Sequence, residues 1–249
     1  MSGRLPSIYA DPALYDLIHA DGTDDEVWFL DTIAKDHGCG IKTALEPACG
    51  TGRYLAGLLR RGYTVEGYDA AGGMLDFARK RLKGWGKRAR VFRGEMSTYR
   101  PKGRYGLILN LLSTFRHLMT DKEALAHLKL MAGALEPGGI FVLGLDLSIY
   151  GEDVPDEEVW DCRQGGRRAK HVVMSIPPEP GTRREKIINF VTEKKRLLES
   201  SYDLRSYSAA EIEELIGRAG LRVEAVYGYD GKPAVLHGPE RALWLVLKK

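Results

Sequence analysis

The sequence predicts an α/β fold in which a mostly parallel sheet is covered by helices on both faces. From residue 42 to residue 147, short apolar strands alternate with helical segments, a rhythm typical of parallel sheets joined by crossover helices. A glycine-rich turn joins the first of these strands to the helix that follows it. The same rhythm returns near the C-terminus after a break at residues 151–205.

The elements of the core follow from local patterns. Two helices are expected between residues 12 and 37, the second with Thr23 and Glu26 spaced as in a capping box. The Pro137-Gly138-Gly139 segment should end the last core helix, because proline and glycine interrupt helices. The expected strands are 42–48, 63–69, 89–95, 104–112 and 138–147, and the expected helices are 53–62, 71–82 and 121–135.

The helical pattern disappears between residues 151 and 205, where we expect antiparallel hairpins. Gln164-Gly165-Gly166 and residues 177–181 are rich in the residue types that form turns. A helix then begins after Ser208, with Glu211 at the capping-box position, and two strands end the chain. The expected strands of this part are 158–164, 167–176, 185–196, 199–207, 221–229 and 241–249.

Composition sets limits on partners and compartment. A formal net charge of +3 over 249 residues gives no strong field toward nucleic acid or membrane, although the segment 80–93 is locally basic. Cys39, Cys49 and Cys162 show no CxxC pair or zinc-ligand spacing, so no metal is expected and a reducing cytoplasm is indicated. The N-terminus lacks a signal-peptide pattern, and no apolar run is long enough to span a membrane.

The first strand and its turn carry the clearest chemical signal. The sequence from Glu46 to Arg53 contains Gly50 and Gly52, which let the backbone approach a ligand beside a helix N-terminus. Asp69 ends the second strand, where an acidic residue can accept hydrogen bonds from ribose hydroxyls. This combination indicates a cofactor that contains a nucleoside.

Two features count against NAD as that cofactor. Leu55 stands where the dinucleotide fingerprint G-x-G-x-x-G has its third glycine. The charge of Glu46 would repel a pyrophosphate, whereas it suits the ammonium group of S-adenosylmethionine (SAM). An NAD-dependent oxidoreductase therefore stays a lesser alternative.

The chain resembles the class I SAM-dependent methyltransferases, in particular a small bacterial and archaeal branch. The resemblance covers nearly the whole chain and rests on the motifs at residues 44–79, 92–99, 105–118 and 135–145. It implies a Rossmann-like class I methyltransferase sheet with an N-terminal helical lid and an inserted antiparallel β cap. We therefore expect a single domain, 1–249, that comprises the lid (1–40), the core (41–150 and 206–249) and the cap (151–205).

The resemblance also implies the positions that bind SAM. Glu46, Gly50, Gly52 and Arg53 would surround its methionine part, and Asp69 would hold the ribose. Glu95 would accept a hydrogen bond from the adenine amino group, although family members often carry Asp there. The other residues implied near the cofactor are Tyr15 in the lid and Ala70, Met74, Met96, Asn110 and Leu111 in the core.

Methyl transfer from a sulfonium mainly requires alignment of the nucleophile, so a catalytic base is optional. If one exists, His117 is the first candidate and Asp146, at the end of the fifth strand, the second. A capping or surface role for His117 is the alternative.

The expected function is methylation of nitrogen or oxygen in a small-molecule acceptor, because a β cap would narrow the mouth of the site. The basic segment 80–93 keeps an RNA or protein methyltransferase as the runner-up. Against RNA, residues 110–113 lack the Asn/Asp-Pro-Pro-aromatic motif of enzymes that methylate base amines. A SAM-binding module without activity is a further alternative. The acceptor itself and the oligomeric state stay open.

Overall fold

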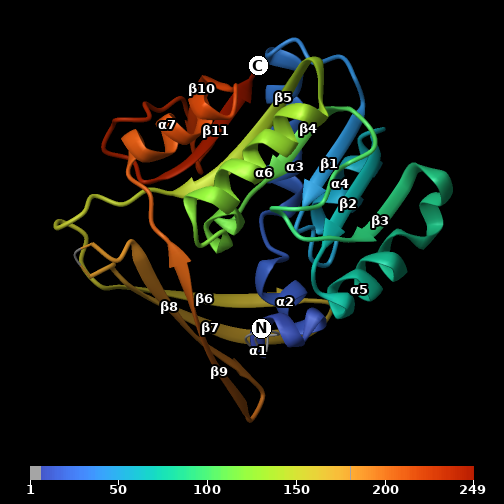
Figure 1. Ribbon diagram of the computed structural model, residues 1–249. Helices are drawn as coiled ribbons and strands as arrows, with labels where there is room; N and C mark the ends of the chain where they lie inside the picture. Colours follow the sequence, from blue (N-terminus) through green and yellow to red (C-terminus); the bar gives the residue numbers. More distant parts are fainter. Residues whose placement is uncertain (1–6, 180) are drawn as a thin grey trace.

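Two sheets organise the chain in the computed structural model, which describes residues 7–179 and 181–249. The larger sheet has seven strands in the order β10-β11-β5-β4-β1-β2-β3, and β11 runs antiparallel to both of its neighbours (Figure 1). Its strands are β1 (Thr43–Pro47), β2 (Thr64–Asp69), β3 (Ala89–Arg93), β4 (Tyr105–Asn110), β5 (Leu135–Asp146), β10 (Arg222–Gly228) and β11 (Ala242–Lys248). The predicted mixed α/β fold with a parallel-rich sheet is confirmed.

Helices cover both faces of this sheet. On one face, α6 (Asp121–Ala134) and α7 (Ala209–Arg218) pack their apolar side chains against β4 and β5. On the other face, α3 (Thr23–Asp36), α4 (Arg53–Arg60) and α5 (Gly72–Leu82) pack against β1, β2 and β4. The remaining helical segments are α1 (Ser7–Ala10), α2 (Pro12–His19) and the 3-10 helices η1 (Lys83–Arg88) and η2 (Thr114–His117).

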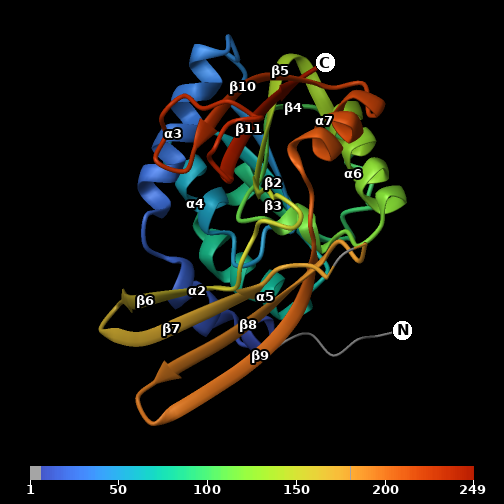
Figure 2. The same ribbon diagram turned by 90° about the vertical axis from the view of Figure 1, so that its left-hand side faces the viewer.

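The cap is the second sheet, with its four antiparallel strands in the order β6-β7-β8-β9. Figure 2 shows it as a separate layer beneath the core, next to the N-terminal helices. Apolar side chains of α1 and α2 pack onto it, including Ile8, Leu14 and Leu17 against Cys162 and Val191. Its strands are β6 (Asp156–Gln164), β7 (Arg167–Ile176), β8 (Arg184–Glu193) and β9 (Arg196–Arg205).

Local details differ from the sequence expectations at three places. Thr23 does not cap α3: Gly22 occupies that position with φ 72°, and the Thr23 hydroxyl donates to the carbonyl of Ala20. Strand β5 begins at Leu135 instead of Gly138, because the chain passes from helix into strand without a turn and accommodates the Pro-Gly-Gly segment in a register shift against β4. Lys194 adopts φ 56° in a tight turn, so β8 ends at Glu193 and β9 begins at Arg196.

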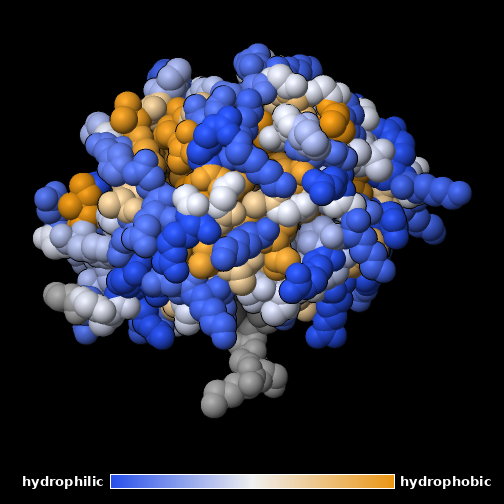
Figure 3. All heavy atoms as spheres, turned by 45° about the horizontal axis from the view of Figure 1, so that its top comes forward, coloured by the Kyte–Doolittle hydropathy of each residue, from blue (hydrophilic) through white to orange (hydrophobic). Residues whose placement is uncertain are grey.

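The capping box of Ser208 and Glu211 is confirmed, and Thr120 and Glu123 form another at the start of α6. Residues 1–6 and Pro180, which belong to the expected N-terminal segment and to the expected turn at 177–181, lie outside the described residues. Hydrophobic residues appear on the face shown in Figure 3 as small patches among hydrophilic ones. None of the helices described is long and apolar enough to cross a membrane.

Gly106→Ala is expected to destabilise the fold by about 3 kcal/mol, the upper range for overpacking a core. A Cβ at Gly106 would overlap the carbonyl oxygen of Ile41 and lie 2.8 Å from the Cys39 sulfur. A backbone carbonyl group cannot move aside as the far end of a flexible side chain can. Urea unfolding measures the effect, with Gly133→Ala in α6 as the control, since a Cβ there meets open space. The control should be neutral or slightly more stable, and an equal loss in both variants would contradict the account.

Candidate active site

The candidate site lies where β1, β2 and β4 end, around the turn that follows β1. Ala48, Gly50 and Gly52 all have positive φ (51°, 51° and 71°), which folds the turn tightly against the start of α4. A small cavity beside the turn brings together five of the predicted residues with their neighbours. Its lining is Tyr15, Glu46, Pro47, Ala48, Cys49, Gly50, Thr51, Arg53, Tyr54, Leu111, Leu112 and Thr114.

Glu46 is the most unusual residue of this cavity. Its side chain is 7% exposed, and its Oε2 atom has no hydrogen-bond partner among the described residues. Burial raises the pKa of Glu46 well above the ordinary value, although the nearby charge of Arg53 opposes the rise. An unpaired buried carboxylate oxygen is costly unless a donor reaches it. The ammonium group of SAM is such a donor, so this residue fits the cofactor that the sequence predicts.

Asp69 holds the same turn from the end of β2. Its two carboxylate oxygens accept hydrogen bonds from the backbone N–H groups of Gly50 and Ala71, each at 2.8 Å. Burial raises the pKa of Asp69, and those two hydrogen bonds work against the rise. Each oxygen keeps a lone pair for another donor, such as a ribose hydroxyl.

The guanidinium of Arg53 makes its contacts with neighbouring protein side chains. It donates to Thr23 Oγ1 at 2.5 Å and to Glu26 Oε2 at 3.1 Å, and it lies 3.8 Å from the centroid of the Tyr54 ring. These contacts fix the group beside α3. The predicted contact with the carboxylate of SAM would use a guanidinium N–H group that these bonds leave over.

The other residues expected near the cofactor are more scattered. Asn110 is buried and donates to the carbonyl of Pro47 at 3.3 Å, and the Met96 sulfur lies 3.6 Å from its Nδ2. Within the described part of the chain its Oδ1 has no hydrogen-bond partner. Met74 is buried in α5, whereas Ala70 and Glu95 are exposed. The charge of Glu95 contributes to the raised pKa of Asp69, which indicates that the two carboxylates are neighbours.

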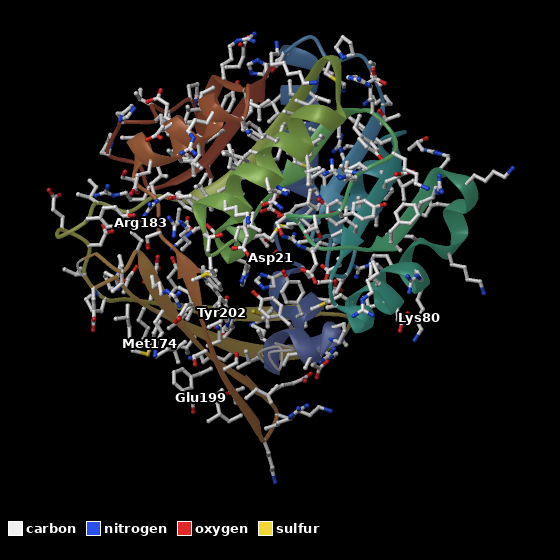
Figure 4. The ribbon with its side chains drawn as sticks, in the orientation of Figure 1. Asp21, Lys80, Met174, Arg183, Glu199 and Tyr202 are labelled. Atoms are coloured by element: carbon white, nitrogen blue, oxygen red, sulfur yellow. The ribbon has the colours of Figure 1, made fainter. Side chains whose placement is uncertain are left out.

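His117 belongs to an aromatic cluster, here called the chamber wall, formed by Tyr9 of α1, Tyr15 of α2, His117 of η2 and Tyr202 of β9. The Tyr9 hydroxyl is hydrogen-bonded to His117 Nε2 at 3.2 Å, and the Tyr202 ring lies 5.4 Å from the His117 ring and 5.6 Å from the Tyr9 ring. Figure 4 labels Tyr202 on β9, close to the N-terminal helices. Lid, core and cap therefore meet at His117.

Burial and the charge of Arg116 lower the pKa of His117 to about 4. The imidazole is therefore neutral at neutral pH, which is the form that can accept a proton. Burial also lowers the pKa of His19 to about 3, so this neighbour of Tyr15 is neutral too.

The second candidate base, Asp146, contacts Ser113 and Arg116. Its carboxylate accepts a hydrogen bond from Ser113 Oγ at 2.6 Å and lies 3.8 Å from a guanidinium nitrogen of Arg116. Arg116 in turn donates to Glu185 and to the carbonyl of Arg205, both in the cap. Asp146 thus supports the segment that carries His117, and its side chain is 46% exposed.

Local sequence patterns do not identify Tyr9 and Tyr202 as neighbours of His117. Alternation along β9 could have placed Leu198, Tyr202 and Leu204 on one face, but nothing local shows what covers that face.

The basic segment 80–93 is partly used inside the fold. Arg81 donates to Asp16, Arg88 donates to the carbonyls of Leu59 and Tyr63, and Arg90 pairs with Glu66. These contacts weaken the sequence argument for a nucleic-acid surface there.

Known proteins resemble this chain in both sequence and structure. Residues 44–139 match the family model described as a methyltransferase domain. A dTDP-3-amino-3,4,6-trideoxy-alpha-D-glucopyranose N,N-dimethyltransferase from Streptomyces venezuelae is 29% identical over 188 residues, which cover 74% of this chain and 77% of that protein.

Two solved structures share the complete architecture. Streptomyces venezuelae DesVI is 25% identical with a TM-score of 0.75, over 94% of this chain and 96% of that chain. CalS10, an amino pentose methyltransferase from Micromonospora echinaspora solved with SAM bound, is 22% identical with a TM-score of 0.75 over 100% of both chains.

Proposed function

We propose that the chain, whose residues 44–139 match a methyltransferase domain and whose structure is similar to SAM-dependent methyltransferases, methylates an amino nitrogen of a small amino sugar or a compound of similar shape. The observation that carries the proposal is the chamber wall, in which His117 is a buried neutral imidazole hydrogen-bonded to Tyr9. An acceptor amine or hydroxyl loses a proton when it is methylated, and a neutral imidazole can accept it. The acceptors in the names of the S. venezuelae relative and of CalS10 are amino sugars, which supports the choice of nitrogen.

SAM supplies a methyl group on a sulfonium, which is already activated toward nucleophiles. Glu46 would hold its ammonium group and Asp69 its ribose hydroxyls, so that the methyl group faces the chamber wall. In this proposal His117 takes the proton that the amine loses on Nδ1, since the Tyr9 hydroxyl holds the other ring nitrogen, Nε2. The aromatic rings exclude water and keep the nucleophile in line, which supplies most of the rate gain.

The other predicted contacts complete the proposed site. Tyr15, Gly50, Gly52 and Arg53 would surround the methionine end, Ala70, Met74, Glu95 and Met96 the adenosine end, and Asn110 and Leu111 the methyl group. Asp146 would hold Ser113 in place through its hydrogen bond and Arg116 through its ion pair. We also propose that residues 1–249 work as one unit of lid, core and cap. The three buried free cysteines suit the reducing cytoplasm as its compartment.

Asp69→Ala is expected to weaken SAM binding by about 1.5 to 3 kcal/mol, the scale for losing charge-assisted hydrogen bonds. The variant also releases the N–H groups of Gly50 and Ala71 that order the turn. Titration calorimetry with SAM measures the change. Asp76→Ala on the exposed side of α5 is the control, since its carboxylate pairs only with Arg79 among the described residues. Unchanged affinity in Asp69→Ala would remove Asp69 from the cofactor site.

A matched set of acceptors tests the proposed function. The protein is incubated with methyl-labelled SAM and a nucleotide-linked 3-amino sugar, with the corresponding 3-hydroxy sugar as the control. We expect label on nitrogen in the first compound and none in the second. Label on the hydroxy sugar would replace nitrogen by oxygen as the acceptor atom, and label in added RNA or protein substrates would favour the runner-up function.

A further inference from the structure

Asp16 of α2 joins three separate parts of the molecule. Its carboxylate is 3% exposed and accepts a hydrogen bond on Oδ1 from Thr51 Oγ1 at 2.7 Å. Its Oδ2 accepts from Arg81 at 2.5 Å and from Gln164 Nε2 at 2.9 Å. Thr51 lies in the turn between Gly50 and Gly52, Arg81 in α5 and Gln164 at the end of β6. One carboxylate therefore connects the lid to the cofactor turn, to the core and to the cap.

The charge of Asp16 is well compensated. Burial alone would raise the pKa of Asp16, but hydrogen bonds from Arg81, Gln164 and Thr51 hold it below the usual range. Arg81 strengthens the junction because it also donates to the Thr51 hydroxyl and carbonyl, at 3.2 Å each. A buried ion pair with complete hydrogen bonding favours one arrangement of its surroundings and costs most when one partner is removed.

The position of Asp16 determines what lies over the cofactor turn. The preceding residue, Tyr15, places its ring so that a Cβ at Gly50 would be 3.6 Å from its Cε1 atom. The cap contributes a second tie to the same helix, where Arg167 donates to the carbonyl of Ala13 at 2.9 Å. Movement of α2 away from the turn would break the Asp16 contacts and uncover Gly50 together.

We propose that Asp16 is a positioning residue that locks the lid and the cap onto the cofactor turn, and thereby sets how long SAM and its demethylated product stay bound. The proposal rests on the cofactor site proposed above. Asp16 does not touch the reacting atoms in this view. It acts through Thr51 and through the position of Tyr15.

The test is the dissociation rate of S-adenosylhomocysteine from Asp16→Asn. An amide at this position presents N–H donors to Arg81 or Gln164 and removes the charge, so we expect dissociation to be about tenfold faster, as for loss of a charged hydrogen bond. The matched control is Asp31→Asn. Asp31 is another buried carboxylate that binds Lys35, Lys42 and Tyr63, all away from the turn. The Asp31→Asn variant should have a lower midpoint of thermal unfolding and an unchanged dissociation rate of S-adenosylhomocysteine.

Gln164→Ala removes only the hydrogen bond that the cap donates to Asp16. The variant should fold normally, since the residue is partly exposed next to a hairpin turn. We expect dissociation to be about threefold faster, the effect of losing one such hydrogen bond. Wild-type dissociation rates in Asp16→Asn or Gln164→Ala would overturn the proposal, as would an equal acceleration in Asp31→Asn. Failure of the wild-type protein to bind S-adenosylhomocysteine would instead contradict the cofactor site itself, and the proposal with it.

Discussion

Glu46→Gln should weaken SAM binding by about 2 to 3 kcal/mol, the range for hydrogen bonds to charged groups, and should make the ligand-free protein more stable at neutral pH. The first effect follows because a neutral amide replaces the carboxylate that faces the ammonium group. The second follows from the raised pKa of Glu46. The folded state binds its proton more tightly than the unfolded state, so stability is lost as pH rises between the two pKa values. Glutamine does not titrate and avoids that loss.

Thermal unfolding with and without SAM measures both effects of Glu46→Gln. The ligand-free midpoint should rise, and the increase that SAM produces should shrink. Glu213→Gln on α7 is the control, because its exposed carboxylate contacts only His237 among the described residues. A variant that binds SAM like the wild type would remove Glu46 from the cofactor site.

His117→Ala is expected to reduce turnover by at least about 100-fold, the lower range for general base catalysis, while SAM affinity changes little. The imidazole lies in the chamber wall and not in the cavity that contains Glu46. Since the lowered pKa of His117 is about 4, its basic form persists far below pH 6.5. The profile of kcat/KM should therefore show no inflection at pH 6.5, where an ordinary histidine titrates.

Steady-state kinetics at varied pH measure this expectation. His237→Ala, which changes an exposed histidine paired with Glu213, is the control and should keep full activity. Tyr9→Phe removes the hydroxyl that holds the imidazole and should have a smaller effect than His117→Ala. Full turnover in His117→Ala would show that the methylation needs no catalytic base and depends only on alignment of the nucleophile.

Local signals in the sequence account for much of the fold. The alternation of apolar strands and helices is a local property, and so is the glycine turn at Gly50 and Gly52, where positive φ is required. Thr23 shows the limit of such signals. The spacing to Glu26 suits a capping box, but Glu26 pairs with Arg53 of α4 and the hydroxyl of Thr23 turns to Ala20. A contact between two helices overrode the local preference.

Some residues of the candidate site could likewise be predicted from local sequence, and others could not. Glu46 and Asp69 could be placed from sequence because each ends a strand beside the glycine turn. The chamber wall could not, because Tyr9, His117 and Tyr202 come from the lid, the core and the cap, and only tertiary packing brings them together. Asp16 shows the same limit, since its partners lie 35, 65 and 148 residues away along the chain.

A crystal structure with S-adenosylhomocysteine and an amino-sugar acceptor would show whether Glu46 and the chamber wall form one methyl-transfer site. The ammonium group of the ligand should lie within about 3 Å of Glu46 Oε2, at hydrogen-bond distance. The sulfur should face the chamber wall, with the acceptor nitrogen beside His117. A ligand bound away from Glu46 would contradict this prediction, for example on the outer side of Arg53, in the open cleft of about 450 Å³ that Asp21, Thr23 and Arg60 also line.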